Sequence, residues 1–388
     1  MPVHAVGWDD APEISEWAGL PPLDGDVRAD ACVVGLGASG LAAATDLVAR
    51  GLSVVGVDAG RVAAGAAGRN GGFLLGGPAA YLHTAIELWG VEAAVGLYRQ
   101  TLDELAALAD TLGSDVVRRV GSIRLAGLPG EPVSPNEAAD RARELADCQA
   151  HADALRRYGI AVEDYRGPLG QGLFLPDDAA TNPAARAIAL ATRLAPQATL
   201  HERTAVRDMA AGRVATEHGN VSAGVVIVAV DGRLEVLLPQ LTGRVRTARL
   251  QMLATEPVAP GRLPCPVYGR WGHDYAQQSA DGRLFAGGGR DLFADAEWTA
   301  DSEPSGPVQD YIDGLATRMA GEPVRVTHRW AASVGFTPDG RPLCTPVADG
   351  VVAVGGYNGT GNLVGPVAAR AAVALAVDGT PPPPYFLS

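Results

Sequence analysis

The chain has 388 residues, 47% of them hydrophobic, and a formal net charge of −13. This length exceeds what one simple core usually supports and predicts about two domains. The negative charge argues against nucleic acid or an anionic membrane surface as a partner.

Two residue types restrict the chemistry. All 31 basic residues are arginine, so a Schiff-base lysine and a pyridoxal-phosphate anchor are impossible. The four cysteines are scattered without a CxxC pair, which gives no support for zinc or dithiol chemistry, and no metal is expected. No secretory leader and no apolar run long enough to span a bilayer are visible, so we expect a cytoplasmic protein with free thiols.

Residues 1–28 are expected to form an extended leader, and the most informative segment, Asp30–Gly72, follows. Its short apolar run Ala31–Val34 predicts a buried parallel strand. Gly35, Gly37 and Gly40 then match the pattern G-x-G-x-x-G. In this pattern the glycines permit a tight turn, close approach to a pyrophosphate and close packing of helix on strand.

The next elements complete a dinucleotide-binding unit. Leu41–Arg50 predicts a helix whose N-terminus suits phosphate, and Leu52–Val57 predicts a second strand. Asp58 ends that strand at the spacing of a carboxylate that accepts from ribose hydroxyls. This unit alone does not distinguish FAD from NAD.

The remaining elements are expected in a mixed order. Helices are expected over residues 87–112, 136–158, 182–194 and 363–377, strands over 122–125, 172–175, 225–230 and 351–354, and a strand-rich region over 244–289. The PPPP tail predicts a disordered or extended terminus.

Five further motifs occur in order along the chain. They are GAAGRNGG at 65–72, VVIVAVDG at 225–232, DGRLFAGGG at 281–289, GFTPDGRPL at 335–343 and GGYNGTGN at 355–362. Together with the leader and the first glycine turn, they resemble the D-amino-acid-oxidase-like family of FAD-dependent oxidoreductases. The similarity is greatest to its gamma-glutamylputrescine oxidase branch and covers nearly the whole chain.

The expected fold class is α/β, with a Rossmann-like FAD-binding domain and an interleaved substrate domain that has an antiparallel or mixed sheet. The order of elements assigns residues 1–84, 166–235 and 326–388 to the FAD-binding domain. Residues 85–165, mainly helical, and 236–325 are assigned to the substrate domain.

The resemblance implies non-covalent FAD, because GAAGRNGG has no histidine and Cys344 follows Thr337–Pro338 instead of preceding it. It implies that Arg69 and Asn70 lie at the flavin ring and that the backbone of Val206 holds the adenine. The implied FAD-binding residues are Gly35, Gly37, Ala38, Ser39, Gly40, Asp58, Ala59, Gly68, Arg69, Asn70, Gly71, Gly72, Val206, Ala229, Gly232, Gly356, Tyr357, Gly359, Thr360, Gly361, Asn362 and Leu363.

The activity that the resemblance implies is oxidation of a C–N bond in an amine or a gamma-glutamylputrescine-like amine conjugate. Hydride passes to the flavin, the imine hydrolyses, and oxygen or another acceptor takes the electrons. The candidate catalytic residues are Tyr275 and His273, both expected on one strand that faces the flavin, and Tyr357. The candidate substrate contacts are Arg270, Gln277, Trp330 and Phe336. Neutral residues, Gln277 and Leu363, stand where amino-acid-specific relatives carry a cation, which argues against a plain α-amino acid.

Three alternatives stay open at this point. The first is a D-amino-acid or glycine-type oxidase or dehydrogenase of the same family, with Arg270 as the carboxylate clamp. The second is a nicotinamide-dependent dehydrogenase, and the third is a non-catalytic flavin-binding protein. The sequence names neither the amine, the electron acceptor nor the oligomeric state.

Overall fold

A computed structural model describes residues 4–388 and divides the chain into two compact units that alternate along the sequence. Unit 1 comprises residues up to Asp10, Asn70–Thr181 and Arg249–Ala332, and unit 2 comprises Ala11–Arg69, Asn182–Ala248 and Ser333–Ser388. The unit boundaries differ from the expected domain boundaries; residues 166–181, for example, belong to unit 1. Which unit binds FAD and which binds substrate stays a prediction.

The central sheet of unit 2 has six strands in the order β19-β20-β13-β2-β3-β9, and only the β19–β20 pair is antiparallel. The strands are β2 (Ala31–Val34), β3 (Val54–Val57), β9 (Thr199–His201), β13 (Val225–Val228), β19 (Leu343–Ala348) and β20 (Val351–Gly355). The strands β2, β3 and β20 are buried along their whole length, as the apolar runs predicted.

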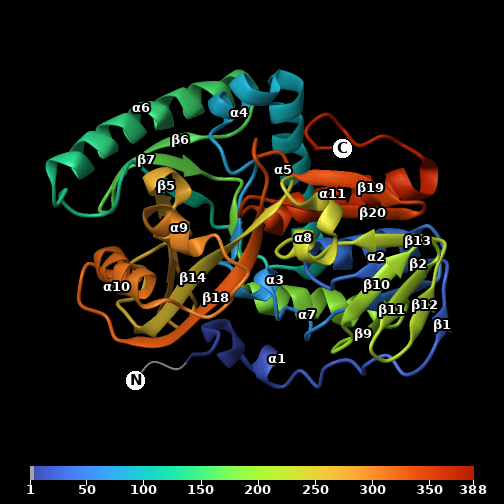
Figure 1. Cartoon of the computed structure of the whole chain (residues 1–388). Coiled ribbons are helices and arrows are strands. Elements are labelled where there is room, and N and C mark those ends of the chain that lie inside the picture. Colours follow the sequence, from blue (N-terminus) through green and yellow to red (C-terminus); the bar gives the residue numbers. More distant parts are fainter. Residues whose placement is uncertain (1–3) are drawn as a thin grey trace. The chain divides into compact units, whose positions relative to one another are not determined.

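Both faces of this sheet are covered within unit 2 (Figure 1). Helices α2 (Ala38–Ala49) and α11 (Gly361–Val373) pack together on one face. Cys32 and Val34 point to the other face, where they pack against Val214 and Val221 of a four-stranded sheet in the order β1-β12-β11-β10.

The other elements of unit 2 are α1 (Pro12–Ser15), β1 (Val27–Arg28), α3 (Ala66–Arg69), α7 (Pro183–Leu194), β10 (Val206–Ala210), β11 (Arg213–Thr216), β12 (Asn220–Ser222), α8 (Leu234–Leu237), a 3₁₀ turn (Pro239–Leu241) and a π-helical turn (Ala374–Asp378).

Unit 1 is built on an eight-stranded sheet in the order β18-β14-β17-β16-β15-β5-β7-β6. Its strands are β5 (Ser122–Leu125), β6 (Glu163–Gly167), β7 (Gly170–Leu175), β14 (Arg246–Pro257), β15 (Val267–Gly269), β16 (Asp274–Gln278), β17 (Arg283–Gly287) and β18 (Val326–Phe336). The other elements are four 3₁₀ or short helical turns, η1 (Gly7–Asp10), η3 (Arg270–Gly272), η4 (Arg290–Phe293) and α9 (Ala294–Glu297), the pair β4 (Phe73–Leu74) and β8 (Ala179–Ala180), and helices α4 (Leu82–Trp89), α5 (Val91–Leu112), α6 (Pro135–Arg157) and α10 (Gly306–Ala320).

Alternation along the strands gives this sheet two different faces. Ile123, Ala276 and Ala286 face helix α10 and share a core with its Ile312 and Met319. The alternate residues of the same strands face the opposite way and include aromatic and polar side chains. At the β5–β7 end, helices α4, α5 and α6 enclose a second apolar cluster (Figure 1).

Three expectations about local structure need correction. The helix expected over 87–112 is two helices, because Gly90 between α4 and α5 has φ +83° and breaks the hydrogen-bonding pattern. The leader contains η1 and α1, although residues 1–3 lie outside the described part. At the C-terminus, Pro381–Pro383 lie outside helices and strands, which agrees with the extended alternative, but the end is not disordered, since Leu387 bridges Leu343 and both Tyr385 and Phe386 are buried.

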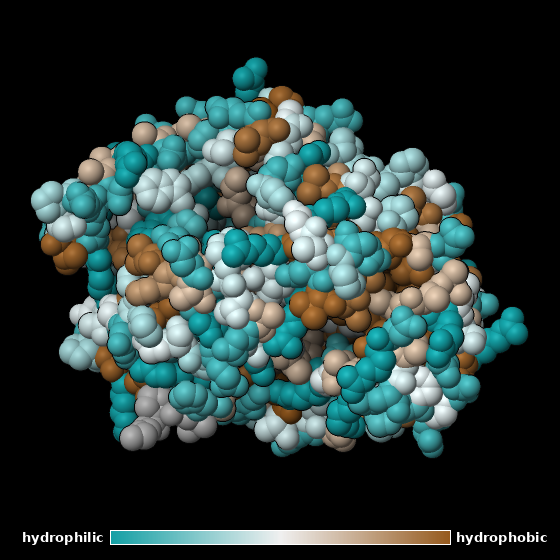
Figure 2. Space-filling view, in the orientation of Figure 1, coloured by the Kyte–Doolittle hydropathy of each residue, from teal (hydrophilic) through white to brown (hydrophobic). Residues whose placement is uncertain are grey.

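Among residues 4–388, no helix combines the length and the apolar character that a bilayer crossing requires. Hydrophilic and hydrophobic residues are intermixed on the face shown in Figure 2. The four cysteines are free and buried.

Candidate functional site

The first glycine turn has the geometry that a dinucleotide requires. Gly35 follows β2 with φ +95°, a conformation that favours glycine. A Cβ on Gly40 would lie 1.7 Å from the carbonyl oxygen of Gly35, so only glycine lets α2 approach the turn this closely. Gly37 is the N-cap of α2 and has no side chain to occupy the N–H groups of Ala38 and Ser39. These N–H groups and the positive end of the helix suit a pyrophosphate.

Asp58 forms hydrogen bonds with two turns of unit 2, the glycine turn after β2 and the turn after β3. Its Oδ2 accepts from the N–H of Leu36 at 2.7 Å, and its Oδ1 accepts from the N–H of Gly60 at 2.8 Å. Burial raises the pKa of Asp58, although both hydrogen bonds favour the carboxylate. Each oxygen keeps a second lone pair, so the group can still accept from ribose hydroxyls beside the exposed Ala59.

In the second glycine segment, GAAGRNGG, the glycine at position 68 has a structural role that the sequence did not reveal. A Cβ on Gly68 would lie 2.2 Å from the carbonyl oxygen of Ala63, which itself has φ +68°. Gly68 is therefore required by packing inside unit 2, whether or not a flavin approaches it. Gly65 has open space around its Cβ position, and Arg69 is the last residue of α3.

After Arg69 the chain enters unit 1, where Asn70–Gly72 is tightly held. Oδ1 of Asn70 accepts from the N–H of Gly72 at 2.7 Å, and the Asn70 carbonyl accepts from the indole N–H of Trp8 at 2.9 Å. The carbonyl of Gly72 accepts from the N–H of Thr181 at 2.9 Å. A side chain on Gly71 would meet the Tyr275 ring at 3.1 Å.

The C-terminal glycine loop of unit 2 is fixed by Asp231, which sequence reasoning missed. Asp231 lies just after β13 with φ +52°, and its carboxylate accepts from the N–H groups of Gly335 at 3.1 Å and Tyr357 at 3.2 Å. Burial raises its pKa to about 6. The loop also needs glycine at Gly356, where φ is +65° and a Cβ would lie 2.5 Å from the Thr337 side chain.

A buried arginine, also missed, fixes the start of α11. Arg186 of α7 is 1% exposed and donates to the backbone carbonyl of Asn362 at 3.1 Å and to its Oδ1 at 3.0 Å. Thr360 is the N-cap of α11, Gly361 is its first residue, and Leu363 is buried. The sequence signal was weak, because Arg186 is one of two arginines, with Arg193, in the mostly apolar segment 183–194.

Tyr357 lies inside unit 2. It is 4% exposed, and its hydroxyl accepts from Oγ of Ser39 at 2.8 Å. Ser39 also touches the position of Gly365, whose Cβ would lie 2.5 Å from the Ser39 Oγ. This contact joins the first turn of α2 to α11 and the glycine loop, so it brings together two segments that the sequence had linked only through resemblance. It supports a structural role for Tyr357, and contact with a substrate stays a prediction.

Three other predicted FAD-binding residues lie at turns of unit 2. Val206 begins β10, Ala229 follows β13, and Gly232 packs against the Ser333 backbone so closely that its Cβ would lie 2.3 Å from that carbonyl oxygen. The Ala229 carbonyl lies against Gly35, since a Cβ on Gly35 would be 2.7 Å from it. Ala229 thus joins the first glycine turn, whereas Gly359 stands in open space at the end of the last loop.

In unit 1, Tyr275 and Gln277 share one face of β16. The Tyr275 ring lies over Gly287 of the neighbouring strand, since a Cβ there would be 2.7 Å from the ring. Gln277 is 1% exposed, and its amide donates to the carbonyl of Gly71 and, at 3.3 Å, to that of Thr181. The two predicted residues therefore both touch Gly71, within the GAAGRNGG motif.

The structure surrounds Arg270 with acidic groups. Its guanidinium contacts Asp274 at 3.1 Å and Asp291 at 2.5 Å, and Tyr311 donates to Asp274 at 2.5 Å. A carboxylate clamp at Arg270 would have to compete with both aspartates. His273 lies in the turn before β16 and not on the strand where we expected it.

The last two predicted substrate contacts lie on β18. Trp330 is 3% exposed and meets Phe285 edge-on at 6.2 Å, and Phe285 stacks on Trp8 at 3.4 Å. Phe336 is the final residue of β18 and is half-buried.

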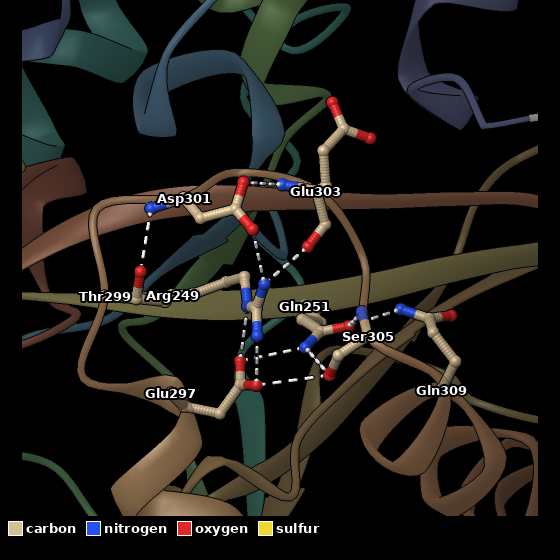
Figure 3. Close-up of polar contacts among 8 residues, drawn as sticks. All are labelled: Arg249, Gln251, Glu297, Thr299, Asp301, Glu303, Ser305 and Gln309. Atoms are coloured by element: carbon tan, nitrogen blue, oxygen red, sulfur yellow. Dashed lines mark hydrogen bonds and ion pairs between the residues drawn. The ribbon is translucent and has the colours of Figure 1, made fainter.

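Unit 1 also contains a dense polar network around Arg249 (Figure 3). Arg249 forms two hydrogen bonds with Glu297, at 2.9 and 2.7 Å, and a third with Asp301 at 3.1 Å. Gln251 donates to Glu297 at 2.8 Å and to Ser305 at 2.7 Å. Because the charges in this network are paired with one another, it serves to fix the segment after α9 against β14.

The comparisons with known proteins agree with this geometry. The family model described as DAO, FAD dependent oxidoreductase, matches residues 30–375. A probable oxidoreductase, OrdL, of Rhizobium meliloti (strain 1021) is 27% identical over 367 residues, which cover 88% of this chain and 81% of the relative. Gamma-glutamylputrescine oxidoreductase of Escherichia coli (strain K12) is 27% identical over 300 residues, which cover 72% and 68%.

Two solved structures share the fold. Glycine oxidase from Geobacillus kaustophilus has a TM-score of 0.71 at 20% identity, covering 93% of this chain and 98% of that chain. L-proline dehydrogenase from P. horikoshii has a TM-score of 0.72 at 17% identity, covering 94% and 98%. Because the family model matches nearly the whole chain, the protein belongs to the DAO family of FAD-dependent oxidoreductases, which confirms the resemblance and establishes FAD rather than a nicotinamide as its cofactor.

Proposed function

We propose that unit 2 holds FAD without a covalent bond and that the enzyme oxidises the C–N bond of an amine or an amine conjugate. The N–H groups of Ala38 and Ser39 would bind the pyrophosphate, and Asp58 would accept from the ribose. The GGYNGTGN loop, held by Asp231, would present the start of α11 to the flavin. When bound, FAD supplies the two-electron acceptor that turns the amine into an imine.

The observation that carries the FAD-binding part is the close contact between Gly40 of α2 and the carbonyl of Gly35, which leaves no room for a side chain at Gly40. The closeness of α2 to Gly35 keeps the helix N-terminus beside the turn, which is the arrangement a pyrophosphate needs. The absence of a covalent bond has a direct test. Flavin should stay in solution when the holoenzyme is precipitated with acid, and flavin in the pellet would contradict the proposal.

The observation that favours an amine or a conjugate over a plain α-amino acid is the state of Arg270. Its guanidinium already contacts Asp274 and Asp291, so no clamp is free there for an α-carboxylate. The curated relative from Escherichia coli is named for gamma-glutamylputrescine, an amine conjugate, which supports the same substrate class.

The side chains of unit 1 can orient such an amine. Burial raises the pKa of Tyr275, so its hydroxyl stays protonated near pH 7 and can form hydrogen bonds but cannot act as a base. Partial burial lowers the pKa of His273, which keeps its imidazole neutral and able to accept a proton. We propose these roles for Tyr275 and His273 in a cytoplasmic enzyme that passes electrons to oxygen or another acceptor.

An anaerobic substrate panel tests this function. Amines, amine conjugates and D- and L-amino acids are added to the holoenzyme, and bleaching of the flavin absorbance is followed. Conjugates and amines should bleach the flavin much faster than α-amino acids, and rapid recolouring on admission of oxygen would identify an oxidase. Preference for a D-amino acid or glycine would favour the alternative of a D-amino-acid or glycine-type oxidase or dehydrogenase of the same family. If no compound of the panel bleaches the flavin, a non-catalytic flavoprotein is favoured.

A further inference from the structure

Arg118 of unit 1 is a rigidly placed, half-buried arginine outside the predicted site. It lies between α5 and β5, and both its backbone N–H and its carbonyl pair with Ala180, at 2.8 and 2.9 Å. The backbone bridge fixes the point from which the side chain extends.

The guanidinium of Arg118 has only neutral partners. Its Nη2 donates to Oε1 of Gln277 at 3.2 Å and to the carbonyl of Gln278 at 3.4 Å. Within the described range 4–388, no carboxylate comes within 4.0 Å of it. Arg249 and Arg270, in the same unit, each contact two carboxylates (Figure 3 for Arg249).

A half-buried cation without a counter-ion is unfavourable. Burial lowers the pKa of Arg118, and no nearby negative charge counteracts the effect. A guanidinium has five N–H donors, and the two long hydrogen bonds come from Nη2 alone. Nε and Nη1 are left for acceptors, and a carboxylate can accept a charge-assisted hydrogen bond from either of them.

Gln277 connects Arg118 to the predicted substrate contacts. Its oxygen accepts from Arg118 while its nitrogen donates to Gly71 and Thr181, so the amide is held from both ends. Tyr275 is two residues away on β16 and therefore on the same face of the sheet, about 7 Å along the strand. An anion at Arg118 would lie on the face that carries Tyr275.

Arg124, a second arginine on this face, is not available in the same way. It is 7% exposed and is enclosed between the rings of Tyr81 and Tyr268, at 4.3 and 4.6 Å. Its charge also acts on the buried carboxylates of Glu144 and Asp178. These contacts identify Arg124 as part of the core under α4 and α6.

We propose that Arg118, positioned by Gln277, forms an anion-binding subsite for a carboxylate that the amine substrate carries away from its oxidised C–N bond. This inference rests on the proposed function and narrows the substrate class to amine conjugates with an acidic group. Arg118 is a specificity-determining residue in this reading, because it binds the remote end of the substrate and not the reacting carbon.

The first test is a binding experiment on the FAD-loaded enzyme with two small probes of the same shape, butyrate and butyramide. Binding is followed by calorimetry and by the change in flavin absorbance. The wild-type enzyme should bind butyrate about 10- to 100-fold more tightly than butyramide, which is the usual advantage of a charged hydrogen-bond pair. Arg118→Met should abolish this preference, and Arg118→Lys should retain part of it.

Arg119 provides a matched control, because it is the exposed neighbour of Arg118 and its loss changes the net charge equally. Arg119→Met should keep the full preference for butyrate. Melting curves and FAD content show whether each variant is folded. Equal butyrate preference in Arg118→Met and wild type would overturn the proposal, as would a folded wild-type enzyme that does not distinguish the probes.

A second test separates this proposal from the proposed function. N-succinylputrescine and N-butyrylputrescine differ in one carboxylate, and the ratio of their kcat/KM values should fall about 10- to 100-fold in Arg118→Met, through KM. If neither compound nor any other amine bleaches the flavin, the amine function fails while the butyrate titration still decides the subsite. If both compounds react with an unchanged ratio in Arg118→Met, the subsite fails and the amine function stands.

Discussion

Replacing Gly40 by alanine tests the geometry of the first glycine turn. The added Cβ would lie 1.7 Å from the carbonyl oxygen of Gly35, where real Cβ atoms keep at least 3.0 Å. The oxygen belongs to the backbone and α2 is packed against β2, so the helix and the turn must move apart by about 1.3 Å. Overpacking of this kind costs about 1–3 kcal/mol of folding free energy.

The same displacement moves the N–H groups of the first turn of α2. Loss of one charge-assisted hydrogen bond to a phosphate is worth about 1.5–3 kcal/mol, so the Kd for FAD should rise at least about tenfold. Titration of the apoprotein with FAD, followed by flavin fluorescence, measures the affinity, and urea unfolding of the apoprotein measures the stability.

Gly314→Ala provides a control in which the same substitution should raise stability and not lower it. Gly314 is an exposed residue within α10, and its Cβ position has open space, so Gly314→Ala should stabilise unit 1 by up to about 1 kcal/mol. It should leave FAD affinity unchanged. If Gly40→Ala binds FAD within about twofold of wild type and unfolds at the same urea concentration, the account of the turn is refuted.

Three further predictions concern buried polar groups. Ser39→Ala and Tyr357→Phe should each lower the free energy of unfolding by about 1 kcal/mol, and the double variant by little more, because both remove one hydrogen bond; a KM change confined to Tyr357→Phe would instead indicate substrate contact. Burial raises the pKa of Asp178 to about 6, above its unfolded value, so stability from this group is present below about pH 4 and is lost as the pH rises through 6. Relative to Asp178→Asn, wild type should lose up to about 3 kcal/mol across that window in urea unfolding, and parallel pH profiles would contradict the assignment. Arg249→Met should cost about 3–5 kcal/mol because it leaves Glu297 buried without its cation, and adding Glu297→Leu should recover part of the loss; no recovery would show that lost packing dominates.

Local chemistry made the first half of unit 2 predictable. Strand, glycine turn, helix, strand and acid follow one another within residues 30–58, so each element is specified by its own residues and their neighbours. The N-terminal end of α7 was predictable for the same reason, since Asn182 accepts from the N–H groups of Ala184 and Ala185 and Pro183 suits the first turn.

Contacts between distant segments could not be predicted in this way. Asp231 with Tyr357 and Arg186 with Asn362 join residues 126 and 176 positions apart. Nothing in the local pattern of either partner specifies the other, because such pairs depend on which strands and helices become neighbours in the folded chain. The sequence therefore indicated the glycine loop but not the groups that hold it.

The arginines show most clearly the difference between what the sequence predicts and what the tertiary structure decides. In the sequence, Arg270 and Arg118 are equivalent cations, and only Arg270 was considered as a carboxylate clamp. Tertiary structure places Asp274 and Asp291 at Arg270 but only neutral groups at Arg118. The sequence by itself determined the family, the cofactor and the first glycine turn, because these depend on short segments with a fixed order. Only the tertiary structure decided which guanidinium remains without a counter-ion, because that depends on the side chains that folding brings around it.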